Sequence, residues 1–138
     1  MLVSFQILSD ISLVHVKYRG FADFASTLAA AQACTEDPAF TPELPHFFDL
    51  GDVTGFEQDF AGFFAMQAQL AAVYPPKETD HLGVFYAPVG PAREMAELAR
   101  KSWDGVPHMV LRILDDNDQA IAVLGLSRDD RAAHLTKI

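Results

Sequence analysis

Four carboxylates stand close together in the segment PHFFDLGDVTGFEQDF, residues 45–60. An apolar run that is typical of a buried strand is interrupted by Asp49 and then followed by Asp52, and Glu57 and Asp59 lie where a helix is expected to begin. In open parallel sheets, ligands bind outside the carboxyl ends of the strands, so these acids are candidates for an active site. Such a cluster could hold Mg²⁺ through oxygen ligands, or supply a general acid and a general base.

Each acid except one also has a local structural explanation. The spacing Thr54-x-x-Glu57 is a capping-box pattern at a helix start. Asp59 would complement the positive end of the helix dipole, and Asp52 is a common turn residue. Only Asp49, inside the apolar run, has no such explanation. An enzyme that depends on carboxylates would therefore have to use Asp49.

The five histidines do not show the spacing of a metal motif. His46, His81 and His108 each precede the apolar part of a predicted parallel strand, so they would gather at the amino edge of the sheet. Strands lie about 4.8 Å apart, so two of these imidazoles could share an ion or a proton. We favour the simpler interpretation of half-exposed edge residues, and predict no metal and no cofactor.

Nucleophilic catalysis has less support. The chain contains no G-x-S-x-G elbow and no phosphate-binding glycine loop. Its single cysteine, Cys34, falls late in a predicted helix, away from the helix N-terminus that would lower the pKa of a thiol. We predict a buried packing cysteine and no catalytic residue.

The second predicted helix is unusually rich in aromatic residues. Its apolar stripe consists of Phe56, Phe60, Phe63, Phe64, Leu70 and Tyr74, and it ends at Pro75 and Pro76. Core packing explains most of this stripe. Any exposed part would mark a protein partner, a contact between two copies of the chain, or an apolar ligand pocket. Membrane insertion is disfavoured, because the helix has no Lys or Arg on its polar face.

The elements that position these residues follow from hydrophobic periodicity. Alternation predicts strands within residues 2–8 and 11–18, joined tightly at Asp10 as an antiparallel pair. Gly20 is predicted to end the second strand, and helical spacing begins at Phe21. Later strands and helices alternate: strands at 44–50, 81–89 and 108–114, and helices from the Thr54 cap, from Pro91 at position N1, and from the Asp116 cap.

This order predicts an α/β domain with a mostly parallel sheet of about five strands, an antiparallel first strand and four helices. Residues 1–126 would form the single domain, and residues 127–138, which have weak patterning, a frayed tail. The length of 138 residues is ordinary for one domain. We find no signal peptide or membrane span in the sequence, and one cysteine permits no internal disulfide, so we expect a cytoplasmic protein. The net charge of -9 disfavours nucleic acid and anionic lipid as partners.

Three short motifs in this order resemble the SpoIIAA-like (STAS) family of anti-sigma-factor antagonists. They are DPAF at residues 37–40, D-L-x-x-V-T at residues 49–54, and LGL at residues 124–126. The similarity is greatest to the SpoIIAA-like branch related in fold to the CRAL-TRIO lipid-binding domain, and it spans about Leu2 to Leu126. The resemblance implies the fold and a binding role rather than a catalytic one.

The resemblance also identifies a position at which the phosphorylated serine of the antagonist branch is absent. In the antagonist branch, an Asp-Ser pair opens the second helix, and a kinase phosphorylates the serine. Asp49, Leu50, Val53 and Thr54 match the preceding strand exit. The positions of the pair are occupied by Glu57 and Gln58, followed by Asp59, so no hydroxyl is present there to accept a phosphate.

We therefore expect a non-enzymatic binding protein that contacts a protein partner through the corner from Asp49 to Phe64. The candidate residues are Asp49, Thr54, Phe56, Glu57, Gln58, Asp59, Phe60, Phe63 and Phe64. Two alternatives remain open: an apolar small molecule or lipid bound beside the Phe-rich helix, and an enzyme that uses Asp49.

Overall fold

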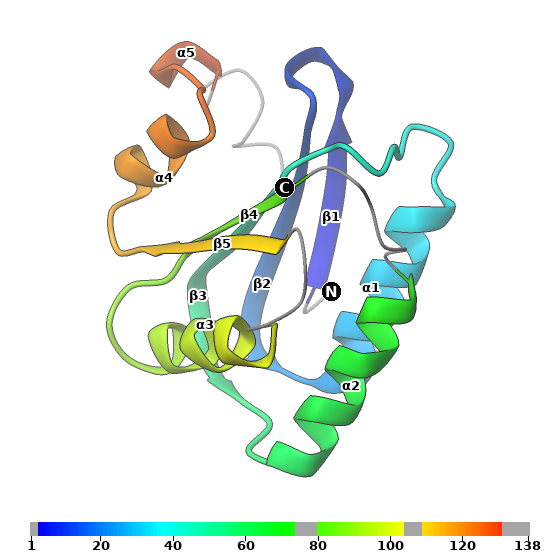
Figure 1. The fold of residues 1–138 in the computed structure, drawn as a ribbon. Helices are drawn as coiled ribbons and strands as arrows, with labels where there is room; N and C mark the ends of the chain where they lie inside the picture. Colours follow the sequence, from blue (N-terminus) through cyan, green and yellow to red (C-terminus); the bar gives the residue numbers. More distant parts are fainter. Residues whose placement is uncertain (1–2, 74–79, 104–108, 131–138) are drawn as a thin grey trace.

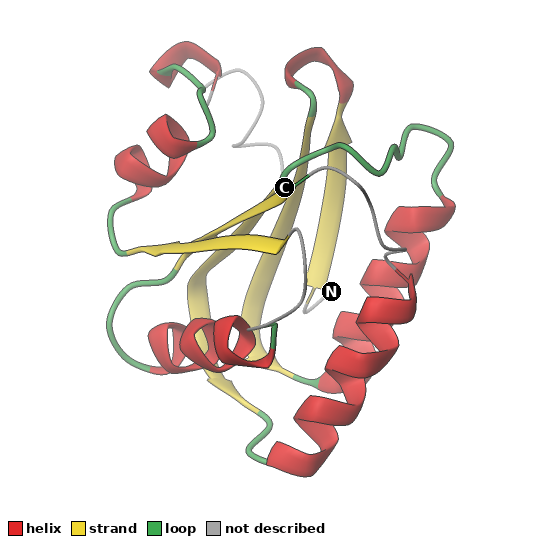
Figure 2. Cartoon of the chain, in the orientation of Figure 1, coloured by secondary structure: helices red, strands yellow, loops and turns green. Residues whose placement is uncertain are grey.

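The computed structural model describes residues 3–73, 80–103 and 109–130, and its centre is a five-stranded sheet in the order β1-β2-β3-β4-β5 (Figures 1 and 2). β1 pairs antiparallel with β2, and all other neighbouring pairs are parallel. The predicted α/β architecture with an antiparallel first strand is confirmed. The strands are β1 Val3–Leu8, β2 Leu13–Ala22, β3 His46–Phe56, β4 His81–Tyr86 and β5 Met109–Leu114.

Helices cover the two faces of the sheet unequally. A sequential order of parallel strands with right-handed crossovers places the three crossover helices on one face. The buried residues of these helices belong to the larger of two hydrophobic clusters, and α4 contributes to the smaller cluster on the other face. In Figure 1, α1 and α2 lie on one side of the view and α4 lies on the other. The helices are α1 Phe24–Glu36, α2 Phe60–Val73, α3 Pro91–Ser102, α4 Asn117–Val123 and the single turn α5 Arg128–Asp130, with a 3₁₀ turn η1 at Ser9–Ile11.

β2 is longer than we predicted, and α1 starts later. Gly20, with φ of +71°, lies within the strand at a shift in the β2–β3 register and does not end the strand. A glycine in the left-handed region is typical of a β-bulge, which explains the wrong boundary. Phe21 consequently belongs to β2, and α1 begins at Phe24 with Asp23 as its N-cap, whose Oδ1 accepts the Ser26 N–H at 2.7 Å.

β3 is also longer than the apolar run 44–50 that predicted it. Its pairing with β2 continues to Ala22 opposite Phe56, so Asp49 and Asp52 lie inside the strand and not after its end. Acidic residues are disfavoured in strands, but here the long neighbouring strand supplies lysine and arginine opposite them. The predicted strand end at residue 50, which placed Asp52 beyond the strand, was wrong for this reason.

The start of α2 corrects a second prediction. Asp59 is its N-cap: Oδ1 accepts the Gly62 N–H at 3.1 Å, and the Asp59 carbonyl accepts the Phe63 N–H at 2.8 Å. Thr54 lies in β3, so the predicted Thr54–Glu57 capping box does not form. The sequence contains two candidate caps within six residues, and the additional length of β3 decides between them.

The starts of α3 and α4 lie where the sequence predicts them. Pro91 is the first residue of α3, and the Asp116 carboxylate accepts the N–H groups of Asp118 and Gln119 at the start of α4. Ser127 and Asp130 cap each other around α5, with bonds of 3.0 and 3.1 Å. The predicted tail therefore contains an ordered turn, while residues 131–138 lie outside the described residues, as do Tyr74, Pro75, Pro76 and His108.

Across residues 3–73, 80–103 and 109–130, none of the helices has the length and apolar character that a membrane crossing requires.

Candidate functional site

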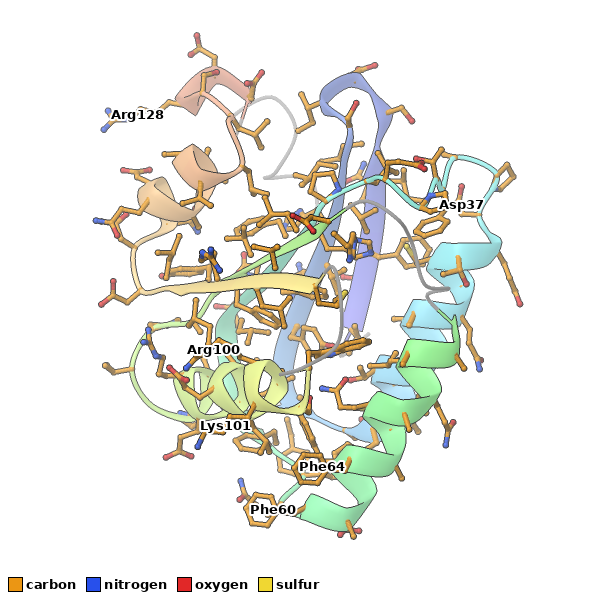
Figure 3. The ribbon with its side chains drawn as sticks, viewed as in Figure 1. Asp37, Phe60, Phe64, Arg100, Lys101 and Arg128 are labelled. Carbon is orange, nitrogen blue, oxygen red and sulfur yellow. The ribbon has the colours of Figure 1, made fainter. Side chains whose placement is uncertain are left out.

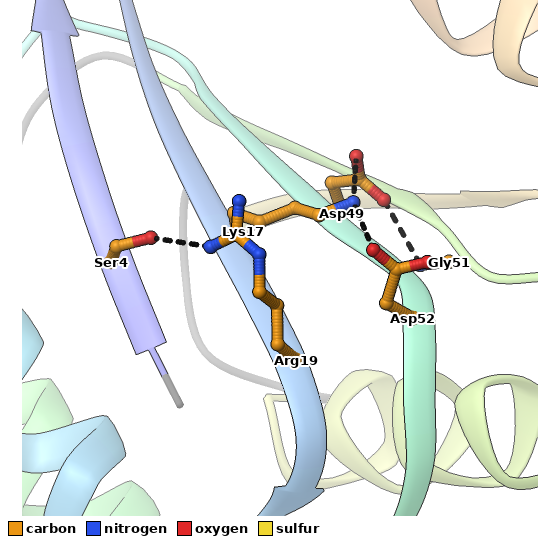
Figure 4. Close-up of polar contacts among 6 residues, drawn as sticks. All are labelled: Ser4, Lys17, Arg19, Asp49, Gly51 and Asp52. Carbon is orange, nitrogen blue, oxygen red and sulfur yellow. Dashed lines mark hydrogen bonds and ion pairs between the residues drawn. The ribbon is translucent and has the colours of Figure 1, made fainter. Parts of the chain in front are cut away.

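Asp49 and Asp52 form a charged cluster with Lys17 of the neighbouring strand β2 (Figure 4). Lys17 Nζ lies 3.0 Å from Asp49 Oδ2 and 3.2 Å from Asp52 Oδ2. The second oxygen of Asp49, Oδ1, accepts the Gly51 N–H at 2.9 Å. In β2, Arg19 donates to Ser4 Oγ at 3.2 Å. Both oxygens of the Asp49 carboxylate are therefore engaged within the protein.

The other predicted acids have structural partners as well. Glu57 Oε1 accepts the backbone N–H of Phe24, the first residue of α1, at 2.9 Å. Asp59 caps α2 as described above. The structure thus assigns both residues to helix starts, although Glu57 caps a different helix from the one we predicted.

The phenylalanines of the corner separate into buried and exposed pairs. Phe56 and Phe63 belong to the main core. Phe60 and Phe64 are 57% and 50% exposed, and Figure 3 shows both rings at the start of α2, clear of the ribbon. Thr54 and Gln58 are exposed too. Five of the nine candidate residues are exposed, and Asp59 among them is engaged as the cap of α2: Thr54, Gln58, Asp59, Phe60 and Phe64.

A cavity of about 100 Å³ lies between the sheet and the three crossover helices. Its wall is mostly apolar. α1 contributes Ala31 and Cys34, and α2 contributes Phe63, Met66 and Leu70. α3 with its C-cap Trp103 and β5 complete the wall of this partly open cavity through Met95, Ala99, Trp103 and Leu111. The apolar cavity that the ligand-binding alternative required is present beside the Phe-rich helix.

Two of the histidines predicted to gather at the amino edge of the sheet meet at this cavity. His46 Nδ1 and His81 Nε2 are 3.0 Å apart, and both lie within 3.2 Å of the Leu44 carbonyl oxygen. The prediction that such edge residues are half-exposed is wrong for His46, which is buried between Phe40 and Phe48. The described residues contain no group of three or more His, Cys, Asp or Glu side chains that could hold a metal.

Two groups in the cavity wall, the Cys34 thiol and the Tyr18 hydroxyl, are held in their neutral forms by burial. Burial raises the pKa of the Cys34 thiol to about 11, helped by the negative charge of Asp37. Burial also raises the pKa of Tyr18, and a side-chain hydrogen bond with Thr27 opposes this rise. The cavity is therefore suited to an uncharged ligand.

Sequence reasoning missed two residues that the structure places in these sites. Lys17 neutralises Asp49, and only the β2–β3 register brings them together. Gln67, in α2, is 7% exposed, and its Oε1 accepts the indole N–H of Trp103 at 3.0 Å. A polar residue on the apolar stripe at helical spacing from Phe63 was the signal that could have identified Gln67.

Comparison with known proteins identifies the fold. No protein-family model matches the chain, and no curated protein matches it. A solved structure does: an uncharacterized protein from the DUF3478 family with a SpoIIAA-like fold, from Shewanella loihica PV-4. The TM-score is 0.53 and the sequence identity 14%, over 88% of this chain and 91% of that chain. The SpoIIAA-like fold inferred from the sequence is confirmed, and at this identity the likeness concerns the fold alone.

Proposed function

We propose that the protein acts by binding, and that it holds a small apolar molecule in the cavity between the sheet and α1, α2 and α3. The cavity carries this proposal. Protein interiors are close-packed, so a pocket of about 100 Å³ between the sheet and three helices is a space that the protein's own side chains leave unfilled. A ligand in this pocket gains the apolar contacts that the wall residues do not make with one another.

A binding role is also supported by the state of the candidate catalytic groups. Asp49 is ion-paired with Lys17 and accepts the Gly51 N–H, so its oxygens are occupied. Cys34 has a pKa of about 11 and stays a thiol at neutral pH. The enzyme alternative would need one of these groups to be available, and the geometry favours it less than binding.

Native mass spectrometry of freshly purified protein, followed by titration with benzene, tests the proposal. We expect a co-purified small molecule, or benzene binding that shifts the NMR methyl signals of Met66 and Met95 in the cavity wall. Ala31→Leu places three more carbon atoms inside the cavity and should weaken benzene binding at least tenfold. Ala29→Leu, on the exposed side of α1, is the matched control.

If Ala31→Leu does not fold, Cys34→Leu, one turn further along α1, provides a second variant in which a larger side chain fills part of the cavity. The proposal is contradicted if wild-type protein carries no ligand and benzene leaves the methionine signals unchanged. It is also contradicted if both filled variants bind benzene as tightly as the wild type does.

A second candidate function is contact with a protein partner through Phe60 and Phe64. These two aromatic rings are one helical turn apart and half or more exposed, and surface aromatic residues are enriched in protein interfaces. Phe60→Asp and Phe64→Asp should abolish such a contact, whereas Val123→Asp, at an exposed position of α4, should not. Pull-downs in which the two Phe variants stay folded and retain every partner would rule out this candidate.

A further inference from the structure

We infer that the ligand of the cavity carries a hydrogen-bond acceptor, most simply a carbonyl oxygen, and that the side-chain amide of Gln67 binds it. This inference rests on the proposed ligand-binding function and specifies the chemical class of the ligand: a compact, uncharged and largely apolar molecule with one acceptor.

The orientation of the Gln67 carboxamide is fixed by its neighbour. The indole Nε1 of Trp103 can only donate, so the Gln67 atom 3.0 Å away from it must be the carbonyl oxygen Oε1. The other branch of the same group, Nε2, carries two donor hydrogens. No residue in the described part of the chain accepts a hydrogen bond from Nε2, although Gln67 is 7% exposed and lines the cavity.

The other polar side chains around the cavity interact with one another. His46 and His81 are hydrogen-bonded to each other and lie against the Leu44 carbonyl. Tyr18 interacts with Thr27, whose hydroxyl donates to the Asp23 carbonyl at 3.0 Å. The Gln67 amide Nε2 is, in any case, a donor that no described side chain of the cavity wall engages.

An unmatched donor in an apolar cavity discriminates between ligands. A buried amide that gains no acceptor when the ligand displaces water costs free energy, whereas a ligand that supplies a carbonyl oxygen satisfies it. Sites built to form a hydrogen bond reject analogues that lack the bonding group. The volume of about 100 Å³ limits the ligand to a single small ring, since a cavity about half as large again, about 150 Å³, is known to bind benzene.

Two probes of nearly the same shape test this inference. Cyclohexanone carries a carbonyl group, and methylenecyclohexane replaces its oxygen with a CH₂ group. Binding of each is followed through the methyl signals of Met66, Met95 and Met109, all in the cavity wall. We expect wild-type protein to bind cyclohexanone about five- to tenfold more tightly, the ratio that one net hydrogen bond provides.

Gln67→Met removes the amide at similar volume and should abolish the preference. Because this change leaves the Trp103 indole without its acceptor, the double variant Gln67→Met, Trp103→Phe removes both partners and provides a second test with less risk to folding. Gln69→Met makes the same change at an exposed glutamine of α2 that does not line the cavity, so it is the matched control and should keep the preference.

The outcomes separate the inference from the proposed function. If wild-type protein binds both probes equally, or if the Gln67 variants keep the preference, the inference is wrong while ligand binding in the cavity stands. If neither probe nor benzene binds, both the inference and the proposed function are overturned.

Discussion

Glu57 Oε1 accepts the backbone N–H of Phe24 at 2.9 Å, so an acid that follows β3 caps α1, which follows β2. The Glu57 backbone reinforces this link, since its N–H donates to the Ala22 carbonyl at 3.0 Å. Glu57 therefore joins the carboxyl ends of two parallel strands. Its role is to position α1, whose inner face forms one wall of the cavity.

Glu57→Ala should destabilise the protein by about 1 kcal/mol, because the first N–H of α1 loses its acceptor. Thr54→Val, in contrast, should change stability by less than about 0.5 kcal/mol, since Thr54 is an exposed strand residue. Urea denaturation of the two variants measures both effects. Equal losses for Thr54 and Glu57 would instead support the capping box expected from the sequence.

Phe63 and Phe64 are adjacent in the chain, but their replacement by alanine should lower the free energy of unfolding by very different amounts. Phe63→Ala empties a buried position and is expected to cost about 3–5 kcal/mol. Phe64→Ala removes a half-exposed ring and should cost under about 1 kcal/mol. Thermal or urea unfolding measures both losses. Similar losses at the two positions would show that α2 is rotated relative to the arrangement described here.

The order of elements was predictable because hydrophobic periodicity depends on local sequence. The antiparallel β1–β2 pair, Pro91 at the start of α3 and the Asp116 cap of α4 all follow from neighbouring residues. Boundaries set by distant pairing were not predictable. Gly20 resembles a strand end, and only the β2–β3 register shows that it is a bulge.

The candidate site was predictable to a smaller extent for the same reason. Asp49 stood out as a carboxylate without a local explanation, and its explanation is Lys17, 32 residues away. The meeting of His46 and His81 could be anticipated from their places at strand starts, but their burial depends on packing by Phe40 and Phe48. The helical spacing could have marked Gln67, but its hydrogen bond to Trp103, 36 residues away at the C-cap of α3, depends on tertiary packing.

The pairing of Lys17 with Asp49 should be worth more than its pairing with Asp52. The side chains of Lys17 and Asp49 are each 14% exposed, whereas that of Asp52 is 64% exposed, so water screens the second pair. A double-mutant cycle with Lys17→Met and Asp49→Asn should give a coupling energy of about 1–2 kcal/mol. The same cycle with Asp52→Asn should give under about 1 kcal/mol. A coupling for Asp52 that equals or exceeds that for Asp49 would contradict this ranking.

His15 makes stability depend on pH in a defined window. Its ring is buried in β2 and stacks on Phe47 at 5.3 Å between ring centroids, and neither ring nitrogen has a hydrogen-bond partner in the described residues. Burial lowers the pKa of His15 from 6.5 to about 4; the charge of Asp49 opposes this shift, and those of Lys17 and Arg19 add to it. Between pH 6.5 and about pH 4 the unfolded chain therefore takes up a proton at His15 that the folded protein does not.

Stability should consequently fall as the pH is lowered from 6.5 towards 4, by up to about 3 kcal/mol from this group alone. His15→Phe keeps a ring against Phe47 and removes the titration, so its stability should decline less over the same interval. Urea denaturation at intervals between pH 4 and pH 7.5 measures the difference between the two curves, in which the contributions of the carboxylates largely cancel. Parallel curves for the wild type and His15→Phe would show that His15 is protonated as easily in the folded protein as in the unfolded chain.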